Sequence, residues 1–182
     1  MSAAADLFAT RGWAATGMRD VAETAGVAIE TLYSHFPSKR TLLEAAMDIA
    51  VAGDDQPLAV ADRDEFAALG RGRREQRIAG AAALVRAINE RTGAYAMVLR
   101  EAAPGDEQVA KLLRATRERQ RRDIEAGIAL IIERPPTAVE TDEVWALLSP
   151  EMYLLLVNEA GWTPAAYERW AATTLDRVVP RS

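Results

Sequence analysis

The spacing of apolar residues constrains this chain more than any other feature of its sequence. Apolar side chains recur every three or four residues along almost the whole length, and the alternating runs typical of half-buried strands are missing. Glycines and prolines that favour turns interrupt this pattern at intervals. The pattern predicts an all-α chain of about nine helices, near residues 2–11, 18–25, 28–35, 39–52, 73–91, 93–103, 106–133, 138–159 and 164–179.

Composition excludes several classes of protein. Apolar residues make up 49% and charged residues 27% of the 182 residues, so the chain can form a core and is not disordered. It has no cysteine and a single histidine, His35, which leaves no thiol nucleophile and too few ligands for a metal site built on cysteine or histidine. No glycine loop that would bind phosphate is present. We therefore expect no cofactor, no metal and no enzymatic activity.

The apolar runs and the first residues predict where the protein is found. The purely aliphatic runs, such as residues 154–157, are far shorter than the ~20 residues that a membrane-spanning helix needs. The first six residues lack the basic start and the apolar stretch of a signal peptide. We expect a cytoplasmic protein with no membrane partner.

The chain divides into two parts that differ in helix length. Residues 1–46, called the head below, hold three short helices with short connections and the start of a longer helix. Residues 47–182 form longer helices, and their loops carry most of the proline and glycine. Because a unit of three short helices is only marginally stable alone, we expect the head to pack against the second part.

Within the head, residues 18–36 have the layout of a helix-turn-helix. Gly26 lies just past the end of the first helix, where a left-handed residue ends many helices, and a second helix follows closely. Apolar residues at positions i, i+4 and i+8 (Ala28, Leu32 and Phe36) predict the buried face of this second helix. The exposed face then carries Ile29, Glu30, Thr31, Tyr33 and Ser34. An exposed isoleucine among hydroxyls suits a major groove, where apolar groups meet thymine methyls and hydroxyls meet phosphates.

A series of short motifs follows the same part of the chain. They are Ala5-Asp6-Leu7-Phe8, Arg11-Gly12-Trp13, Arg19-Asp20-Val21-Ala22, Ala25-Gly26-Val27, Thr31-Leu32-Tyr33, His35-Phe36, and Ser38-Lys39 with Leu42-Leu43. In these motifs and their spacing, residues 3–46 resemble the DNA-binding domain of TetR-type transcriptional regulators. The resemblance implies an all-α fold with a helix-turn-helix DNA-binding domain at 1–46 and a helical ligand-binding and dimerisation domain at 47–182.

The resemblance also implies DNA-binding roles, residue by residue. In the recognition helix it implies base-reading roles for Ile29, Glu30 and Thr31. It implies contacts with the DNA backbone for Tyr33 and His35. Arg19, in the preceding helix, matches a position that reaches phosphate or a base edge. Lys39 matches the phosphate-binding lysine at the start of the following helix, and Ser38 is well placed to cap that helix.

The last two predicted helices, 138–159 and 164–179, differ from the others in their apolar surface. The first of them is apolar on more than one face, as expected for a helix buried both by its own domain and by a partner. In TetR-type proteins the last two helices pair with their copies as a four-helix dimer interface, and the resemblance implies the same here. A two-fold dimer suits a palindromic operator of double-stranded DNA, with half-sites about one helical turn apart.

Small-molecule control is a further expectation for the second part. A pocket between helices needs an apolar lining with a few polar tips. We expect an apolar or aromatic effector in such a pocket, lined by Tyr95, Leu99, Leu112, Thr116, Trp145 and Tyr153. Ordinary core is an equal alternative for each of these residues. A bound effector would act by changing the spacing of the two heads of a dimer.

A run of arginines lies in the middle of the helix predicted at 106–133. It consists of Arg114, Arg117, Arg119, Arg121 and Arg122, interleaved with acidic residues. Such a run on a helix favours a solvated face with ion pairs between positions i and i+4, rather than a nucleic-acid surface.

These observations favour a ligand-responsive, homodimeric transcriptional repressor that binds a palindromic operator. The alternative is a TetR-like helical dimer that has lost DNA binding and acts as a small-molecule or protein-binding module. Glu30, an acidic residue on the surface expected to face DNA, keeps this alternative open. So does the charge of the head, where four basic residues stand against five acidic ones, a net charge of −1 that predicts weak non-specific affinity for DNA.

Overall fold

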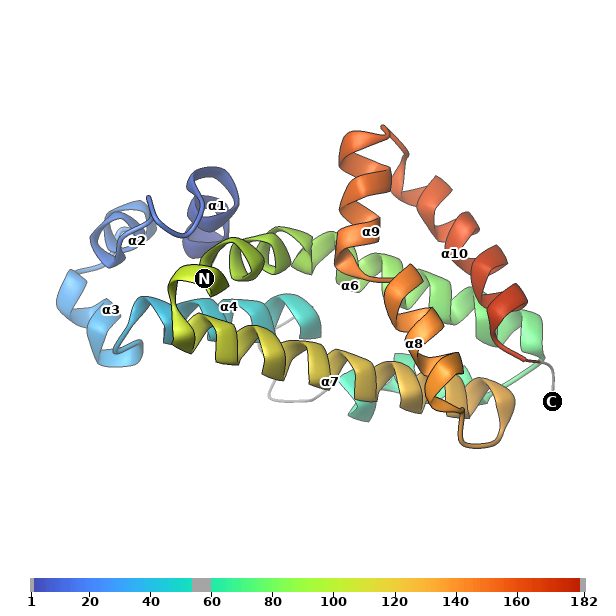
Figure 1. Cartoon of the computed structure of the whole chain (residues 1–182). Helices are drawn as coiled ribbons and strands as arrows, with labels where there is room; N and C mark the ends of the chain where they lie inside the picture. Colours follow the sequence, from blue (N-terminus) through green and yellow to red (C-terminus); the bar gives the residue numbers. More distant parts are fainter. Residues whose placement is uncertain (1, 54–59, 181–182) are drawn as a thin grey trace. The chain divides into compact units, whose positions relative to one another are not determined.

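The computed structural model describes residues 2–53 and 60–180, and within these ranges all regular structure is helical (Figure 1). The prediction of an all-α chain is therefore confirmed. The longer elements are α1 (Ser2–Arg11), α2 (Met18–Ala25), α3 (Ile29–His35), α4 (Lys39–Ala52), α6 (Arg74–Ala102), α7 (Glu107–Ile132), α8 (Ala138–Leu147) and α10 (Pro164–Val178). The shorter ones are α5 (Asp64–Ala67), α9 (Pro150–Leu154), 3-10 turns at Val60–Asp62, Ala68–Gly70 and Ala103–Gly105, and a π-helical turn at Leu155–Glu159. No helix in the described ranges is both long and apolar enough to cross a lipid bilayer.

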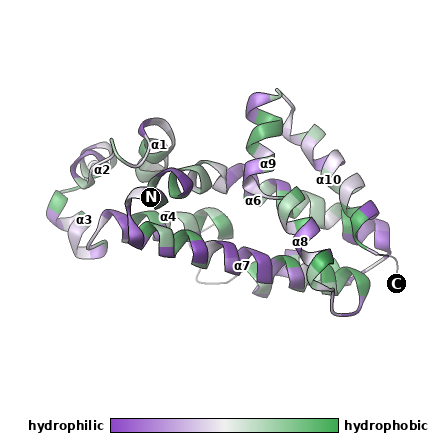
Figure 2. Ribbon diagram, in the orientation of Figure 1, coloured by the Kyte–Doolittle hydropathy of each residue, from purple (hydrophilic) through white to green (hydrophobic). Residues whose placement is uncertain are grey.

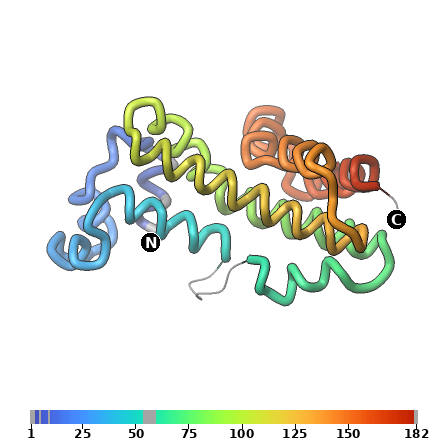
Figure 3. Tube along the Cα trace, turned by 60° about the horizontal axis from the view of Figure 1, so that its bottom comes forward, coloured from blue at the N-terminus to red at the C-terminus, as the bar shows by residue number. Residues whose placement is uncertain are grey.

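The helices group into two compact units that do not follow chain order. The first unit comprises residues 1–55 and 94–116, and the second comprises residues 56–93 and 117–182. Helix α6 contributes residues 74–93 to the second unit and 94–102 to the first. Helix α7 contributes residues 107–116 to the first unit and 117–132 to the second, and Figure 3 traces both helices. The division of the chain into domains at 1–46 and 47–182 stays a prediction.

The core of the first unit joins the head to a segment far along the chain. Phe8 of α1, Val21 of α2 and Leu43 of α4 belong to one buried cluster. Leu99 of α6 and Val109 of α7 belong to the same cluster, and both are fully buried. The head is therefore completed by the end of α6, the turn at Ala103–Gly105 and the start of α7.

The core of the second unit contains a polar cluster between α6, α8 and α10. The amide nitrogen of Asn89 donates to the carbonyl of Leu148 (2.9 Å) and to the hydroxyl oxygen of Tyr167 (3.1 Å). Burial raises the pKa of the Tyr167 phenol to about 12. The ring of Tyr167 meets Tyr153 edge-on, with ring centroids 4.8 Å apart. Buried amides and hydroxyls cost free energy when they have no hydrogen-bond partner. This cluster therefore specifies how α10 packs on α6.

Two predicted helix boundaries are wrong, each for a local reason. The break expected near residue 92 does not occur, because α6 passes through Gly93 without interruption. A side chain at Gly93 would come within 3.0 Å of Leu154, so this glycine provides room for a neighbouring helix instead of a turn. The single helix expected at 138–159 is divided at Leu148, because Ser149 caps a new helix and accepts a hydrogen bond from the Met152 amide (3.2 Å). Pro150 occupies the first turn of this helix, where a proline is favoured.

The arginine-rich stretch of α7 forms ion pairs with other helices. Figure 2 shows the middle of α7 as strongly hydrophilic. Arg121 pairs with Asp142 of α8 at 2.7 Å, and Arg117 pairs with Glu151 of α9 at 3.3 Å. The prediction of a solvated face with ion pairs thus has the right chemistry for these two residues. Their ion-pair partners lie in α8 and α9, and Glu125, at position i+4 from Arg121, adds an attraction within α7.

A capping box begins α8 and provides a pH-dependent contribution to stability. The carboxylate of Glu140 accepts from the Thr137 amide (2.7 Å) and from two nitrogens of Arg134 (2.9 and 3.1 Å). The Thr137 hydroxyl accepts from the Glu140 amide in return (3.3 Å). The Arg134 guanidinium and the Thr137 amide together lower the pKa of Glu140 from 4.5 to about 2.

We predict that replacing Glu140 by glutamine removes part of the acid sensitivity of the fold. A carboxyl whose pKa is lowered by folding stabilises the native state above its unfolded pKa and loses that effect as it is protonated. The stability difference between wild type and Glu140→Gln should be fully present at pH 7 and disappear between pH 4.5 and about pH 2. Denaturant unfolding at a series of pH values measures it. Glu143→Gln, on an exposed site of the same helix, is the control, and a difference that persists at pH 2 contradicts the prediction.

Candidate nucleic-acid interface

A tight turn joins α2 to α3 and sets the geometry of the candidate interface. Gly26 ends α2 in the left-handed conformation (φ 67°), which is costly for residues with a side chain. Its amide donates to the carbonyl of Glu23 (3.1 Å), and the amide of Val27 donates to that of Ala22 (3.0 Å). These two hydrogen bonds form a Schellman motif. The chain therefore leaves α2 in a defined direction and begins α3 three residues later, which is a helix-turn-helix arrangement.

The buried face of α3 differs from the predicted one by one position. Leu32 is buried and Phe36 packs against the core, as predicted, but Ala28 is exposed. Ile29 takes its place and packs against the core of the first unit. The expectation of a fully exposed Ile29 is therefore wrong. The buried stripe of Ile29, Leu32 and Phe36 follows the spacing i, i+3 and i+7, which places three side chains on one face of a helix.

The exposed face of α3 is polar and aromatic. Glu30, Thr31, Ser34 and His35 are exposed, and Tyr33 is 49% exposed although it is a large aromatic residue. A carboxylate can only accept hydrogen bonds, whereas the hydroxyls of Thr31 and Tyr33 can both accept and donate. This face can accept from a base amino group at Glu30 and donate to phosphate or base acceptors at the hydroxyls.

The ring of His35 makes two contacts within the last turn of α3. Its Nδ1 lies 2.9 Å from the carbonyl oxygen of Thr31, and the Ser34 hydroxyl donates to the same oxygen (2.8 Å). The Ser34 hydroxyl oxygen also lies 3.1 Å from Nδ1. Nδ1 can therefore donate to the Thr31 carbonyl in one tautomer of the ring or accept from the Ser34 hydroxyl in the other.

The two basic residues expected to contact DNA are placed differently. Arg19, in the first turn of α2, is exposed. Lys39, the first residue of α4, is only partly exposed, and its ammonium donates to the carbonyls of Trp13 (2.7 Å) and Thr16 (2.9 Å). Arg19 is thus available to a phosphate, whereas Lys39 is already engaged within the head.

Comparison with known proteins agrees with this geometry. Residues 1–46 match the family model of the bacterial regulatory proteins of the tetR family. The head thus matches the model of this family over its whole length. A curated relative, the HTH-type transcriptional repressor KstR2 of Mycolicibacterium smegmatis (strain ATCC 700084 / mc(2)155), is 46% identical over 44 residues. These residues are 24% of this chain and 22% of the relative, so the chain matches less than a quarter of that protein's length.

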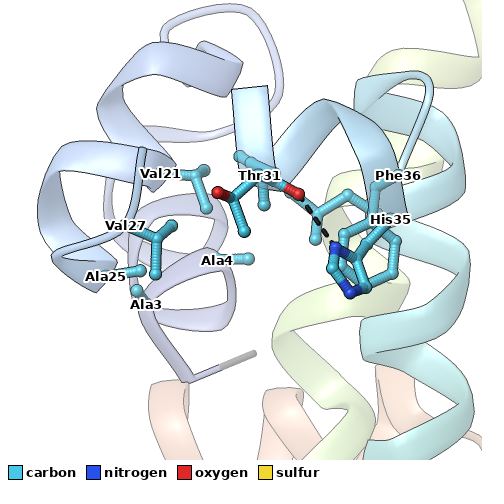
Figure 4. Close-up of a pocket in the computed structure, with 10 residues that line it drawn as sticks. Ala3, Ala4, Val21, Ala25, Val27, Thr31, His35 and Phe36 are labelled. Carbon is cyan, nitrogen blue, oxygen red and sulfur yellow. Dashed lines mark hydrogen bonds between the residues drawn. The ribbon is translucent and has the colours of Figure 1, made fainter. Parts of the chain in front are cut away.

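An apolar hollow of about 250 Å³ lies within the TetR-family head (Figure 4). Ala3 and Ala4 of α1, Val21 of α2 and Val27 of the turn contribute to its lining. Thr31 and His35, two of the candidate DNA-binding residues, also line it, and Figure 4 shows their hydrogen bond at its edge.

The residues expected to line an effector pocket lie in both compact units. Tyr95, Leu99 and Leu112 belong to the core of the first unit, and all three have the burial of core residues. Thr116 lies in the same unit, and its hydroxyl is buried without a hydrogen-bond partner. In the second unit, Trp145 donates to the side-chain oxygen of Gln120 (3.2 Å), and Tyr153 is buried against Tyr167. Their assignment to a ligand pocket stays a prediction.

The contacts around Lys39 were not anticipated from the sequence. Trp13 follows the Arg-Gly pair at the end of α1, and Lys39 lies 26 residues further along the chain. A lysine at the first position of a helix is normally solvated, and nothing in the sequence around Trp13 or Lys39 predicts a contact between them. The only local signal is Gly17 before α2, where a serine or threonine cap is usual, because a helix start without such a cap needs support from elsewhere.

Proposed function

We propose that the chain is a ligand-responsive, homodimeric transcriptional repressor that binds a palindromic DNA operator. The observation that carries this proposal is the helix-turn-helix of α2 and α3 within a TetR-family head, with Glu30, Thr31 and Tyr33 exposed along α3. Recognition helices of this type enter the major groove with their N-terminal residues toward the base edges. Such a regulator acts on the chromosome, which places it in the cytoplasm.

Three exposed residues of α3 and Arg19 of α2 have chemically suitable DNA partners. The Glu30 carboxylate, near the start of α3, suits the N4 amino group of a cytosine. Thr31 offers a methyl group to thymine and a hydroxyl to other base edges. Tyr33 and Arg19 suit phosphate oxygens, which fix the orientation of the head on the duplex without reading sequence.

Dimerisation through residues 138–159 and 164–179 is the second element of the proposal. Val139 of α8 and Leu155, in the π-helical turn that continues α9, are 67% and 47% exposed, high values for large apolar side chains. Burial of such side chains by a second copy would remove apolar surface from water. A two-fold dimer would place two copies of α3 on successive half-sites, about 34–36 Å apart.

An apolar or aromatic effector is the third element. The Thr116 hydroxyl supports it, because a buried hydroxyl without a partner costs about 1–3 kcal/mol that a ligand able to hydrogen-bond would recover. The effector would favour one spacing of the two heads over another and thereby change the affinity for the operator. No catalytic role is proposed, since the single histidine lies on the DNA-facing helix and the chain contains no cysteine.

Selection of fragments from the encoding genome by the purified protein at low salt tests this proposal. We expect enrichment of a palindrome and loss of that enrichment in Tyr33→Ala, because Tyr33 is exposed and makes no contribution to the core. Absence of any enriched sequence for the wild-type protein contradicts a DNA-binding function. It would favour the alternative, a TetR-like helical dimer that acts as a small-molecule or protein-binding module.

A glutamine at position 30 distinguishes weak DNA binding from none. If Glu30 reads a cytosine, Glu30→Gln should change the preferred base at one position of each half-site toward adenine, whose N6 and N7 suit an amide. If Glu30 only repels phosphate, the same change should raise affinity for all sequences alike. Glu23→Gln, which removes an exposed charge from α2, is the matched control. No binding by either variant or by wild type supports the alternative module.

A further inference from the structure

The ends of three helices meet at the side chain of Lys39. Helix α1 ends at Arg11, α2 begins at Met18 and α4 begins at Lys39 itself. The Lys39 ammonium donates to the carbonyls of Trp13 (2.7 Å) and Thr16 (2.9 Å), both in the turn between α1 and α2. It also lies 4.1 Å from the centre of the Trp13 ring, which is a cation–π contact. Trp13 is held in turn by stacking on Phe8, with ring centroids 5.8 Å apart.

These contacts satisfy the ammonium inside the head. An ammonium has three N–H donors, and here two of them bind carbonyl oxygens while an aromatic face covers the charge. Burial lowers the pKa of Lys39, and the negative charge of Asp106 opposes this effect. A DNA phosphate would find at most one free donor on this residue.

The turn held by Lys39 leads directly into the start of α2. Thr16 is fully buried, and its hydroxyl lies within hydrogen-bonding distance of the carbonyls of Leu7 (3.1 Å) and Gly12 (2.9 Å). The next residue, Gly17, is the cap of α2 and has no side chain with which to bind the helix amides. The carboxylate of Asp20 accepts from the Gly17 amide (2.8 Å), and the Lys39 ammonium binds the carbonyl of the residue before Gly17, Thr16. The position of α2 and of its exposed Arg19 depends on this turn.

We propose that Lys39 is a positioning residue, whose ammonium fastens the turn between α1 and α2 to the first residue of α4 and is engaged in this way before any DNA is bound. This differs from the phosphate-binding role implied for Lys39 by resemblance. It goes beyond the proposed repressor function, and its first two tests need no DNA, so failure to find an operator leaves them informative.

Chemical acylation of the free wild-type protein gives the first test. The chain has only two lysines, and Lys111 is an internal reference with a half-exposed side chain paired to Glu107. We expect Lys39 to be acylated about tenfold more slowly than Lys111 in the native protein, since the reagent must displace its hydrogen bonds, and equally fast in denaturant. Rapid acylation of Lys39 in the free protein, with protection only after DNA is added, overturns the inference.

Thermal unfolding of two matched variants gives the second test. Lys39→Met keeps the aliphatic stem and removes the ammonium, and should lower the unfolding midpoint by about 4–8 °C. Arg40→Met removes the same charge from the next residue, whose contact with Glu44 is a surface pair at 3.7 Å, and should change the midpoint by about 1 °C. In Lys39→Met, amide hydrogen exchange should rise at residues 13–18. Equal midpoints for the two variants overturn the inference, even if Lys39 resists acylation.

The salt dependence of DNA binding separates positioning from direct contact. On a mixed-sequence duplex at low salt, a lysine that binds phosphate contributes about 0.9 to the slope of log affinity against log salt. We expect Lys39→Met to bind more weakly than wild type with an unchanged slope, whereas Arg19→Met should reduce the slope by about 0.9. A slope reduced in Lys39→Met as much as in Arg19→Met assigns Lys39 to the phosphate and overturns the inference. If Lys39→Met does not fold, the acylation ratio of the wild-type protein decides.

Discussion

Replacement of Leu99 by alanine should lower the free energy of unfolding by about 3–5 kcal/mol and loosen the DNA-binding head, 50 residues or more away in sequence. Leu99 is fully buried in the cluster that contains Phe8, Val21 and Leu43. Removal of three buried carbons leaves a cavity that closely packed neighbours fill only in part. Because these neighbours position α1, α2 and α4, the variant should lose operator affinity as well as stability.

Denaturant unfolding and amide hydrogen exchange together measure this effect. We expect exchange to rise in α1–α4 and in residues 94–116, and to change little in α8 and α10, which belong to the second unit. Met97→Ala is the matched control, since Met97 lies two residues earlier in α6 and is 48% exposed. A loss no greater than that of Met97→Ala, or faster exchange confined to α6, would show that Leu99 does not support the head.

The helices whose ends carry cap signals could be predicted closely from the sequence. The left-handed Gly26 ends α2, Ser38 begins α4 through a capping box, and Thr163 with Pro164 begins α10. In each case the residues that satisfy the free amides or carbonyls lie within a few positions of the helix end. A signal of this kind is local, so the sequence contains it in full.

Features that depend on distant neighbours could not be predicted in the same way. Gly93 has the sequence signal of a break, but its role is to admit Leu154, which lies 61 residues away. The inclusion of residues 94–116 in the core of the first unit has no local signal, so the packing of Leu99 in one cluster with Phe8 and Val21 could not be predicted. A phosphate-binding role for Lys39 was expected from the resemblance, and its contacts inside the head have no local signal because the carbonyls that it binds lie in another turn. Periodicity shows that a face is buried but does not identify what buries it.

The candidate recognition helix lies between these two cases. Its limits and the exposure of Glu30, Thr31 and Tyr33 follow from a helix of seven residues that is anchored by Leu32. The direction of its first turn does not follow from the sequence, because Ala28 and Ile29 are both apolar and either could complete the buried face of α3. The larger side chain buries more apolar surface, and the structure places Ile29 inward.

Replacement of Tyr167 by alanine should have the complementary effect, a loss of about 3–5 kcal/mol that is concentrated in the second unit. Tyr167 is fully buried in α10, its ring contacts Tyr153 and Trp170, and its hydroxyl accepts from Asn89. Tyr167→Phe keeps the ring and should cost only about 1 kcal/mol, the usual net value of one hydrogen bond. The difference between the two variants separates packing from the polar contact.

The consequences of Tyr167→Ala for assembly connect this core to the proposed dimer. Hydrogen exchange should rise in α8, α10 and residues 74–93 and remain near wild type in α1–α4, the reverse of the pattern for Leu99→Ala. Since α8 and α10 would form the proposed dimer interface, sedimentation should show a larger fraction of monomer. Arg169→Ala, an exposed change on the same helix, is the control. An unchanged proportion of dimer in a destabilised Tyr167→Ala protein would place the interface outside α8 and α10.

Because the Tyr167 phenol has its pKa raised to about 12, the wild-type protein should also lose stability between pH 10 and 12, and Tyr167→Phe should lose less.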